Sequence, residues 1–194
     1  YRRDPAAAGQ RWNTVWEKWW LEGTKDKPWT SDMANWLRAP DGLGAWYDWP
    51  GLSLPDGSAE AGVGFVGQLW LGTHVNLTAE QAAKGATLDL GSATEEEISW
   101  VNGAGVGGSS LAPAATHRLP PGLLHAGDNT VVTNIFCSWK NCGLSGPGDS
   151  RAIRFDDGTS VTLAGPWFYQ PVKDRIAVQL PWGPMHGITQ QYNG

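Results

Sequence analysis

The chain is poor in cysteine, in clustered positive charge and in long apolar runs, and each shortage excludes a class of protein. Two of its 194 residues are cysteines, and 14 lysines and arginines stand against 19 aspartates and glutamates, for a net charge of −5. No run of five basic residues occurs, so we expect no nucleic-acid partner. No apolar run approaches the roughly 18 residues of a membrane-spanning helix, so we expect no membrane partner.

The two cysteines give little support for a metal site. Cys137 and Cys142 have four residues between them, with no CxxC spacing and no histidine close by, so zinc is poorly supported. In an oxidising compartment they could form a small-loop disulfide, and in a reducing one they would stay free thiols. The chain shows no signal peptide, and its abrupt ends at Tyr1 and Gly194 lead us to expect a segment of a longer protein.

Tryptophan and glycine are abundant instead. Thirteen tryptophans stand against four phenylalanines and four tyrosines, and 26 glycines with 13 prolines indicate many turns. An indole ring has a flat apolar face and one N–H donor, so it suits a protein core and the stacking of a sugar ring equally well.

Residues 1–60 are expected to form a helical, Trp-rich lead-in. Asp4 and the proline after it are a helix start, and the pattern predicts a helix from Pro5 to about Glu22. Trp12, Trp16 and Trp19 recur on one face of it, which we interpret as a domain interface, with a ligand platform as the alternative. A second short helix is predicted after Thr30-Ser31, followed by an ordered loop over 41–56; its apolar face would consist of Met33, Trp36 and Leu37, and Pro40 would end it.

From residue 61 to about 180 the apolar period changes to two, which predicts strands. Turn pairs separate these strands at intervals of roughly 8–12 residues, a pattern typical of an antiparallel β-sandwich or jelly roll. The fold class is therefore mainly β, with Trp70, Trp100 and Trp167 in the core and an irregular segment at 181–194. The expected strands lie near Val63–Leu77, Thr87–Leu90, Ile98–Val101, Thr130–Phe136, Ala152–Phe155, Ser160–Leu163 and Arg175–Leu180, and the expected turns at Asn102-Gly103, Pro121-Gly122, Gly127-Asp128-Asn129 and Asp157-Gly158.

The order of several short motifs resembles a known family. The motifs are Gly67-Gln68-Leu69-Trp70-Leu71, Leu88-Asp89-Leu90-Gly91, Trp100-Val101-Asn102-Gly103, Arg118-Leu119-Pro120 and Gly127-Asp128-Asn129-Thr130, followed by Cys142–Gly146, Ala164–Trp167 and Gln191–Gly194. In this order they resemble the galactose-binding-like jelly roll inserted in sialate O-acetylesterase-like SGNH esterases, a group that includes acetylxylan esterases. The resemblance covers roughly residues 61–194.

The resemblance implies a non-catalytic insertion. The family's catalytic serine motif lies before the inserted domain and its Asp-x-x-His pair lies after it, so the chain would be no enzyme by itself. It would be a carbohydrate-binding or accessory domain that shapes the substrate site of an O-acetylesterase acting on acetylated xylan or sialic acid. A purely structural insertion without glycan affinity is the alternative. The resemblance also implies a flanking esterase domain, a carbohydrate partner and a periplasmic or extracellular location.

Residues that could carry chemistry mostly have a structural interpretation. Gly148-Asp149-Ser150 has the letters of an SGNH nucleophile motif, but it precedes a strand instead of following one, so we interpret it as a turn. Glu95-Glu96-Glu97 is expected to be a solvated turn, because adjacent strand residues point to opposite faces and cannot flank one bond. The scattered histidines are expected at the surface or hydrogen-bonded in the core; they are His74, His117, His125 and His186.

Aromatic residues in loops are the candidates for sugar binding, because a ring in a loop can stack on a pyranose while nearby polar groups bind its hydroxyls. One group consists of Trp139, Lys140 and Asn141 in the loop closed by the two cysteines. The other consists of Trp46, Tyr47 and Trp49; packing in the core or at an interface is the alternative for both groups. No cofactor is expected, although Asp156-Asp157 or Asp128-Asn129 could offer oxygens to a structural calcium.

Overall fold

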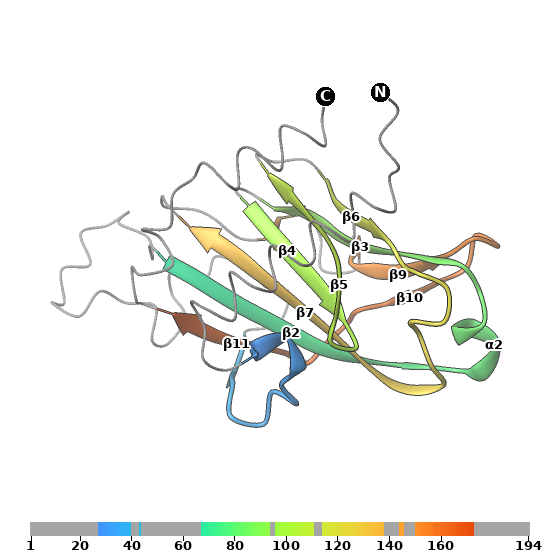
Figure 1. Cartoon of the computed structure of the whole chain (residues 1–194), viewed down its shortest axis with the longest axis horizontal. Coiled ribbons are helices and arrows are strands. Elements are labelled where there is room, and N and C mark those ends of the chain that lie inside the picture. Colours follow the sequence, from blue (N-terminus) through green and yellow to red (C-terminus); the bar gives the residue numbers. More distant parts are fainter. Residues whose placement is uncertain are drawn as a thin grey trace, which may run out of the picture.

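The computed structural model describes residues 27–39, 43, 67–93, 96–110, 114–137, 144–145 and 150–172. These residues form two antiparallel sheets, which confirms the predicted mainly β sandwich. In Figure 1 the long strands β2 and β7 run diagonally side by side, while β3, β6, β9 and β10 lie together on the right of the view.

The first sheet has six strands and the second has five. The order in the first is β1 (Leu37–Arg38), β11 (Trp167–Val172), β2 (Gly67–Leu77), β7 (Gly127–Cys137), β4 (Glu96–Val101) and β5 (Ala104–Ser110). The second contains β10 (Ser160–Thr162), β9 (Ala152–Phe155), β3 (Ala86–Ala93) and β6 (Ala114–Arg118), with β8 (Leu144–Ser145) paired to β3 as well. The short helices are the 3-10 turn η1 (Pro28–Thr30) and α2 (Ala79–Ala82).

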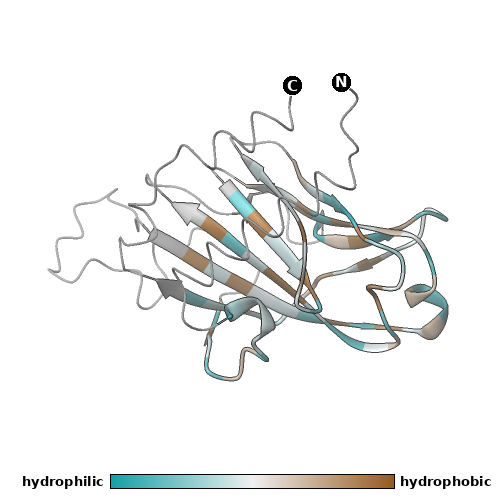
Figure 2. Ribbon diagram, in the orientation of Figure 1, coloured by the Kyte–Doolittle hydropathy of each residue, from teal (hydrophilic) through white to brown (hydrophobic). Residues whose placement is uncertain are grey.

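Alternating apolar residues place the core between the sheets. Along β2, Leu69 and Leu71 are buried and belong to the same cluster as Leu88 of β3 and Ile153 of β9. Figure 2 shows the alternation as brown and paler or teal bands along β2, β7 and β4. Because every second side chain of a strand points to the same face, this pattern assigns one inner face to each sheet.

Three of the predicted turns are present. Asn102 and Gly103 connect β4 to β5 with φ of 50° and 79°, the left-handed pair that a two-residue hairpin of type I′ requires. Gly158, at φ 85°, closes the β9–β10 hairpin, where the Phe155 carbonyl accepts from the Gly158 N–H. Gly122, at φ 78°, follows a proline in the third turn, as in a turn of type II.

The prediction of a turn at Gly127-Asp128-Asn129 is wrong, because these residues begin β7. Strand β2 extends to Leu77, which pairs with Gly127. The backbone of residues 127–129 is therefore paired with β2 along its whole length. Strands β5 and β6 were not predicted, and of β11 the sequence indicated only Trp167 as a strand residue. Strand β5 contains three glycines in seven residues, a composition that is depleted in strands, and its pairing with β4 stabilises it.

The second predicted helix is also absent. Residues 31–36 follow the 3-10 turn without forming a helix, and Leu37–Arg38 is a strand paired with β11. Met33 has a φ of 61°, which ends any helix, and its buried side chain lies over Gly72. The helix predicted over 5–22, the strand over 175–180, the 181–194 segment and all of the 41–56 loop except Leu43 lie outside the described residues.

Residues 27–36, which we call the strap, cover part of the outer face of the six-stranded sheet. The ring of Trp29 stacks on Trp100, with centroids 5.3 Å apart, and lies 6.0 Å from the ring of Trp70. Ile98 and Val132 complete this second apolar cluster. The burial of Trp70, Trp100 and Trp167 confirms that these three indoles belong to the core.

Candidate functional site

Most of the residues predicted from the sequence to bind sugar or a partner domain lie outside the described part of the chain. These are Trp139, Lys140, Asn141, Trp46, Tyr47, Trp49, Trp12, Trp16 and Trp19; Cys142, considered for a disulfide, also lies outside it. Cys137 is the last residue of β7, so the disulfide stays a prediction. Ser150 lies two positions before Ala152, where β9 begins, and its carbonyl accepts a hydrogen bond from Arg154 Nη2 at 3.0 Å.

The acidic run near residue 96 contains a buried carboxylate, so the prediction of a solvated turn is wrong for Glu97. This residue is 1% exposed and points to the inner face of β4. Its Oε1 lies 2.6 Å from Nε2 of His117, and its Oε2 accepts from the Ser99 hydroxyl at 2.7 Å. The Thr133 hydroxyl lies 3.0 Å from that of Ser99. Pairing replaces the hydration that a buried carboxylate loses, which explains why Glu97 is tolerated in the core.

This cluster contains the three group types of a catalytic triad in an order that does not activate a nucleophile. A triad places histidine between the serine and the carboxylate, whereas Glu97 lies between Ser99 and His117. The side chains of His117 and Glu97 are 6% and 0% exposed, so a substrate does not reach them. A Cβ on Gly107 would lie 2.6 Å from Nδ1 of His117, so the backbone of β5 closes over the other ring nitrogen. We interpret the cluster as a structural link between the sheets.

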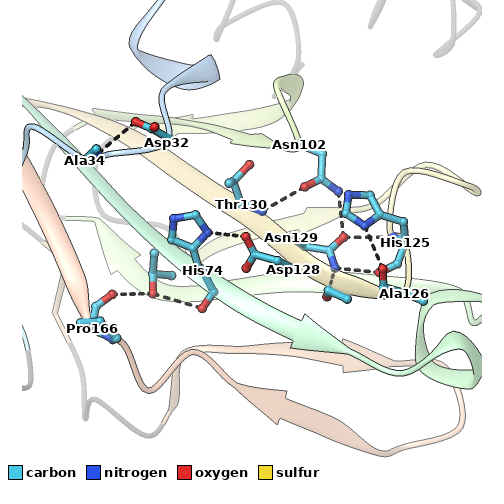
Figure 3. A network of polar contacts seen from close by, with 12 residues as sticks. Asp32, Ala34, His74, Asn102, His125, Ala126, Asp128, Asn129, Thr130 and Pro166 are labelled. Atoms are coloured by element: carbon cyan, nitrogen blue, oxygen red, sulfur yellow. Dashed lines mark hydrogen bonds and ion pairs between the residues drawn. The ribbon is translucent and has the colours of Figure 1, made fainter.

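An exposed imidazole–carboxylate pair lies on the outer face of the six-stranded sheet. His74 Nδ1 is 2.8 Å from Asp128 Oδ2, and the two side chains are 33% and 52% exposed. Figure 3 shows them pointing toward one another, His74 from β2 and Asp128 from β7. The residues are 54 apart in the chain, and no spacing rule could have joined them. The register of β2 and β7, in which Thr130 faces His74, brings them together.

A network of amides fixes the chain next to this pair. Asn129 is fully buried, and its Oδ1 accepts from Asn102 Nδ2 at 2.8 Å and from the His125 N–H at 3.0 Å. Its Nδ2 donates to the carbonyls of His125 and Gly127. Asn102 also accepts from the Thr130 N–H, on the other side of Asn129 (Figure 3). The start of β7 is therefore held on both sides of its buried amide, which positions Asp128.

The strap borders the same polar face. A Cβ on Gly72 would lie 2.1 Å from Met33 Sδ and 3.3 Å from Trp36 Cζ3, so the missing side chain lets both residues contact the sheet. Trp36 is partly exposed and packs against the outer-face cluster. Because Gly72 and His74 share one face of β2, an aromatic ring and a polar pair follow one another along the strand.

The acidic pairs considered for calcium are engaged by protein groups. Arg118 binds Asp156 through both terminal guanidinium nitrogens and holds the pKa of that carboxyl below its ordinary value. The Lys84 ammonium, 2.7 Å from Asp157, and Thr159 lower the pKa of Asp157 in the same way. Among the described residues, no three His, Cys, Asp or Glu side chains lie close enough together to hold a metal ion.

The described residues contain no helix long and apolar enough to cross a membrane. No protein-family model matches the chain, and no curated protein sequence matches it.

Solved glycosidase structures are similar to it in fold. The β-glucuronidase of an uncultured Clostridium sp. aligns with 59% of this chain at 13% identity and a TM-score of 0.46. The Ruminococcus gnavus β-glucuronidase in complex with uronic isofagomine aligns with 77% at 17% identity and a TM-score of 0.45. The Streptomyces avermitilis α-L-rhamnosidase complexed with L-rhamnose aligns with 76% at 18% identity and a TM-score of 0.44.

These three neighbours are carbohydrate-active enzymes, and none of them is an esterase. The aligned parts span 19%, 26% and 14% of the three enzymes' own chains, in the same order. Identities and TM-scores of this size do not assign this chain to a family.

Proposed function

We propose that the chain is an accessory β-sandwich domain of a carbohydrate-active enzyme, in which it binds glycan or shapes the substrate site. The observation that carries the proposal is the order of the family-like motifs. Gly67–Leu71 lies on β2, Leu88–Gly91 on β3, Trp100–Gly103 at the end of β4 and its turn, and Gly127–Thr130 at the start of β7. Motifs spread over 64 residues of chain thus belong to one sandwich, as expected for a domain of that type.

The finer proposal is that the parent enzyme is a carbohydrate O-acetylesterase that acts on acetylated xylan or sialic acid. The sequence resemblance to the domain inserted in such esterases supports it. In that family the serine and Asp-x-x-His motifs lie on either side of the inserted domain. The chemistry then belongs to the flanking domain, and we propose a periplasmic or extracellular location for the whole enzyme. The burial of Glu97 and His117 agrees with this division, since these groups cannot touch a substrate.

Affinity electrophoresis tests the proposal. The chain is run through native gels that contain soluble xylan, acetylated xylan or other plant polysaccharides, with a gel lacking polysaccharide as control. We expect retardation on at least one glycan. Unchanged mobility on all of them would remove the glycan-binding role.

A purely structural role is the second candidate, and the strap favours it. Trp29 of the strap is 4% exposed, stacks on Trp100 and packs at a tilt against Trp70, so the strap is joined to the sandwich. A bracing domain would show no retardation on any glycan. Replacing Trp12 or Trp16 by alanine would instead lower the melting temperature of the parent enzyme.

A further inference from the structure

We infer that the outer face of the six-stranded sheet carries a subsite for an uncharged sugar, formed by His74, Asp128 and Trp36. The inference rests on the proposed function and names the place where a glycan would bind. It starts from the exposed pair of His74 and Asp128, whose side chains are 33% and 52% accessible. An ion pair or hydrogen bond this exposed contributes little to stability, so the fold does not require it.

The pair is nevertheless rigidly held. Both residues lie on the two longest strands, and β2 and β7 pair without interruption from Gly67↔Cys137 to Leu77↔Gly127. Asn129, directly after Asp128, is buried and takes part in four hydrogen bonds to Asn102, His125 and Gly127. A ligand that binds the pair therefore meets groups that are already ordered, which lowers the entropic cost of binding.

The free atoms of the pair suit hydroxyl groups. Nδ1 of His74 donates to Oδ2 of Asp128 at 2.8 Å, which leaves Nε2 and Oδ1 without a further partner among the described residues. A carboxylate oxygen accepts from a hydroxyl, and Nε2 accepts or donates according to the protonation of the ring. Two polar atoms on adjacent strands are thus available to hydroxyls of one sugar.

Trp36 supplies the apolar part of the subsite. Its ring lies at Gly72, which is two residues before His74 on the same face of β2. Two strand residues span about 7 Å, the scale of a single pyranose ring. The indole is partly exposed, so it can cover the C–H face of a sugar whose hydroxyls reach the pair.

The charge of the site favours a neutral glycan. An anionic sugar would place its carboxylate against Asp128, on a chain whose net charge is already −5. The proposed function leaves a choice between xylan and sialic acid as substrate class. The subsite fits the neutral xylan-type chain better than sialic acid.

The test combines glycan binding with a probe placed at the site. Acetylated and unacetylated xylo-oligosaccharides, and separately N-acetylneuraminic acid, are titrated into the chain while the imidazole signals of His74 and His125 are followed by NMR. We expect a xylo-oligosaccharide to shift the His74 signals and to leave those of His125, on the neighbouring loop, unchanged. His74→Ala and Asp128→Asn should each weaken binding about tenfold, the effect of one well-placed hydrogen bond.

The matched controls are His125→Ala and Asp156→Asn. His125 is a second exposed histidine, and Asp156 is an exposed aspartate that pairs with Arg118 at the five-stranded sheet. Both should bind like the unaltered chain. If the unaltered chain binds xylo-oligosaccharides and the His74 and Asp128 variants bind equally well, the subsite is overturned while the proposed function stands. If no glycan binds the unaltered chain, the subsite and the glycan-binding role are both overturned, and the structural role is left. Tighter binding of N-acetylneuraminic acid than of the neutral sugars would overturn the assignment to an uncharged ligand.

Discussion

Oε1 of Glu97 lies 2.6 Å from Nε2 of His117, and this contact links the two sheets through the core of the sandwich. Glu97 belongs to β4 of the six-stranded sheet and His117 to β6 of the other sheet. Apolar contacts alone would leave the spacing of two sheets to side-chain volume, whereas a hydrogen bond also sets direction. The pair therefore contributes to the register of the sheets as well as to their adhesion.

Removing one partner of this pair should destabilise the chain strongly. His117→Ala leaves the Glu97 carboxyl buried without its imidazole, and we expect a loss of about 3 kcal/mol in the free energy of unfolding. Urea denaturation measures it, with His125→Ala as the exposed control. The double variant Glu97→Leu/His117→Leu should cost less than the sum of the two single leucine variants. Additive losses would contradict a coupled pair.

Gly107 and Gly122 offer a matched pair of alanine substitutions. Both have positive φ, 149° and 78°, but a Cβ at Gly107 meets His117 Nδ1 at 2.6 Å, whereas one at Gly122 meets nothing within 4 Å. We expect Gly122→Ala to cost about 1–2 kcal/mol through backbone strain and Gly107→Ala about 3 kcal/mol, because overpacking is added. Equal losses in thermal or urea unfolding would show that β5 does not pack closely on the imidazole.

The strap should contribute to the stability of the sandwich through Trp29. Trp29→Ala removes the ring stacked on Trp100 and exposes Trp70, at a cost of about 3–5 kcal/mol. Leu37→Ala is the control, since Leu37 is 45% exposed and should change stability by about 0.5 kcal/mol or less. A Trp29→Ala variant that unfolds like the unaltered chain would mean that the strap is not part of the cooperative unit.

We expect the side chain of Asn102 to contribute more to the stability of the chain than its backbone conformation does. Glycine adopts the φ of 50° without strain, so Asn102→Gly keeps the turn and removes the hydrogen bonds to Leu123, Asn129 and the Thr130 N–H. We expect a loss of about 1–3 kcal/mol and faster hydrogen exchange at Thr130. Unchanged exchange would show that the start of β7 is held without the amide network.

Acid should weaken the ion pairs that hold the hairpin between β9 and β10. Arg118 and Lys84 lower the pKa of Asp156 and Asp157 below the ordinary value of 3.8. Between the lowered pKa values of the folded chain and the ordinary value, the unfolded chain binds more protons than the folded chain. The stabilisation by these two ion pairs is therefore complete above about pH 4 and is lost as the pH falls below it.

The melting temperature measured against pH tests this. Asp156→Asn/Asp157→Asn should lower it at neutral pH and flatten its decline in acid, whereas Asp32→Asn, on the strap, should leave the decline unchanged. Salt should reduce the difference because both carboxylates are exposed. A decline equally steep in the double variant would place the acid sensitivity elsewhere.

Local patterns in the sequence predicted a large part of the architecture. The alternation along β2 and the left-handed positions at Asn102 and Gly103 are properties of short segments, and they identified a strand and a hairpin correctly. The prediction failed at Met33, where a helical pattern met a residue with a φ of 61° whose side chain packs on Gly72. It failed at Gly127 because the length of β2, 50 residues earlier in the chain, decides where β7 begins.

The sequence by itself thus determined the mainly β character of the chain, its tight turns and the burial of its strand tryptophans. Tertiary structure alone decided that Glu97 pairs with His117 in the core and that His74 meets Asp128 on the outer face. The physical reason is the range of the interactions. Backbone sterics and apolar periodicity act within a few residues, whereas the register between distant strands follows from packing and hydrogen bonding of the whole sandwich.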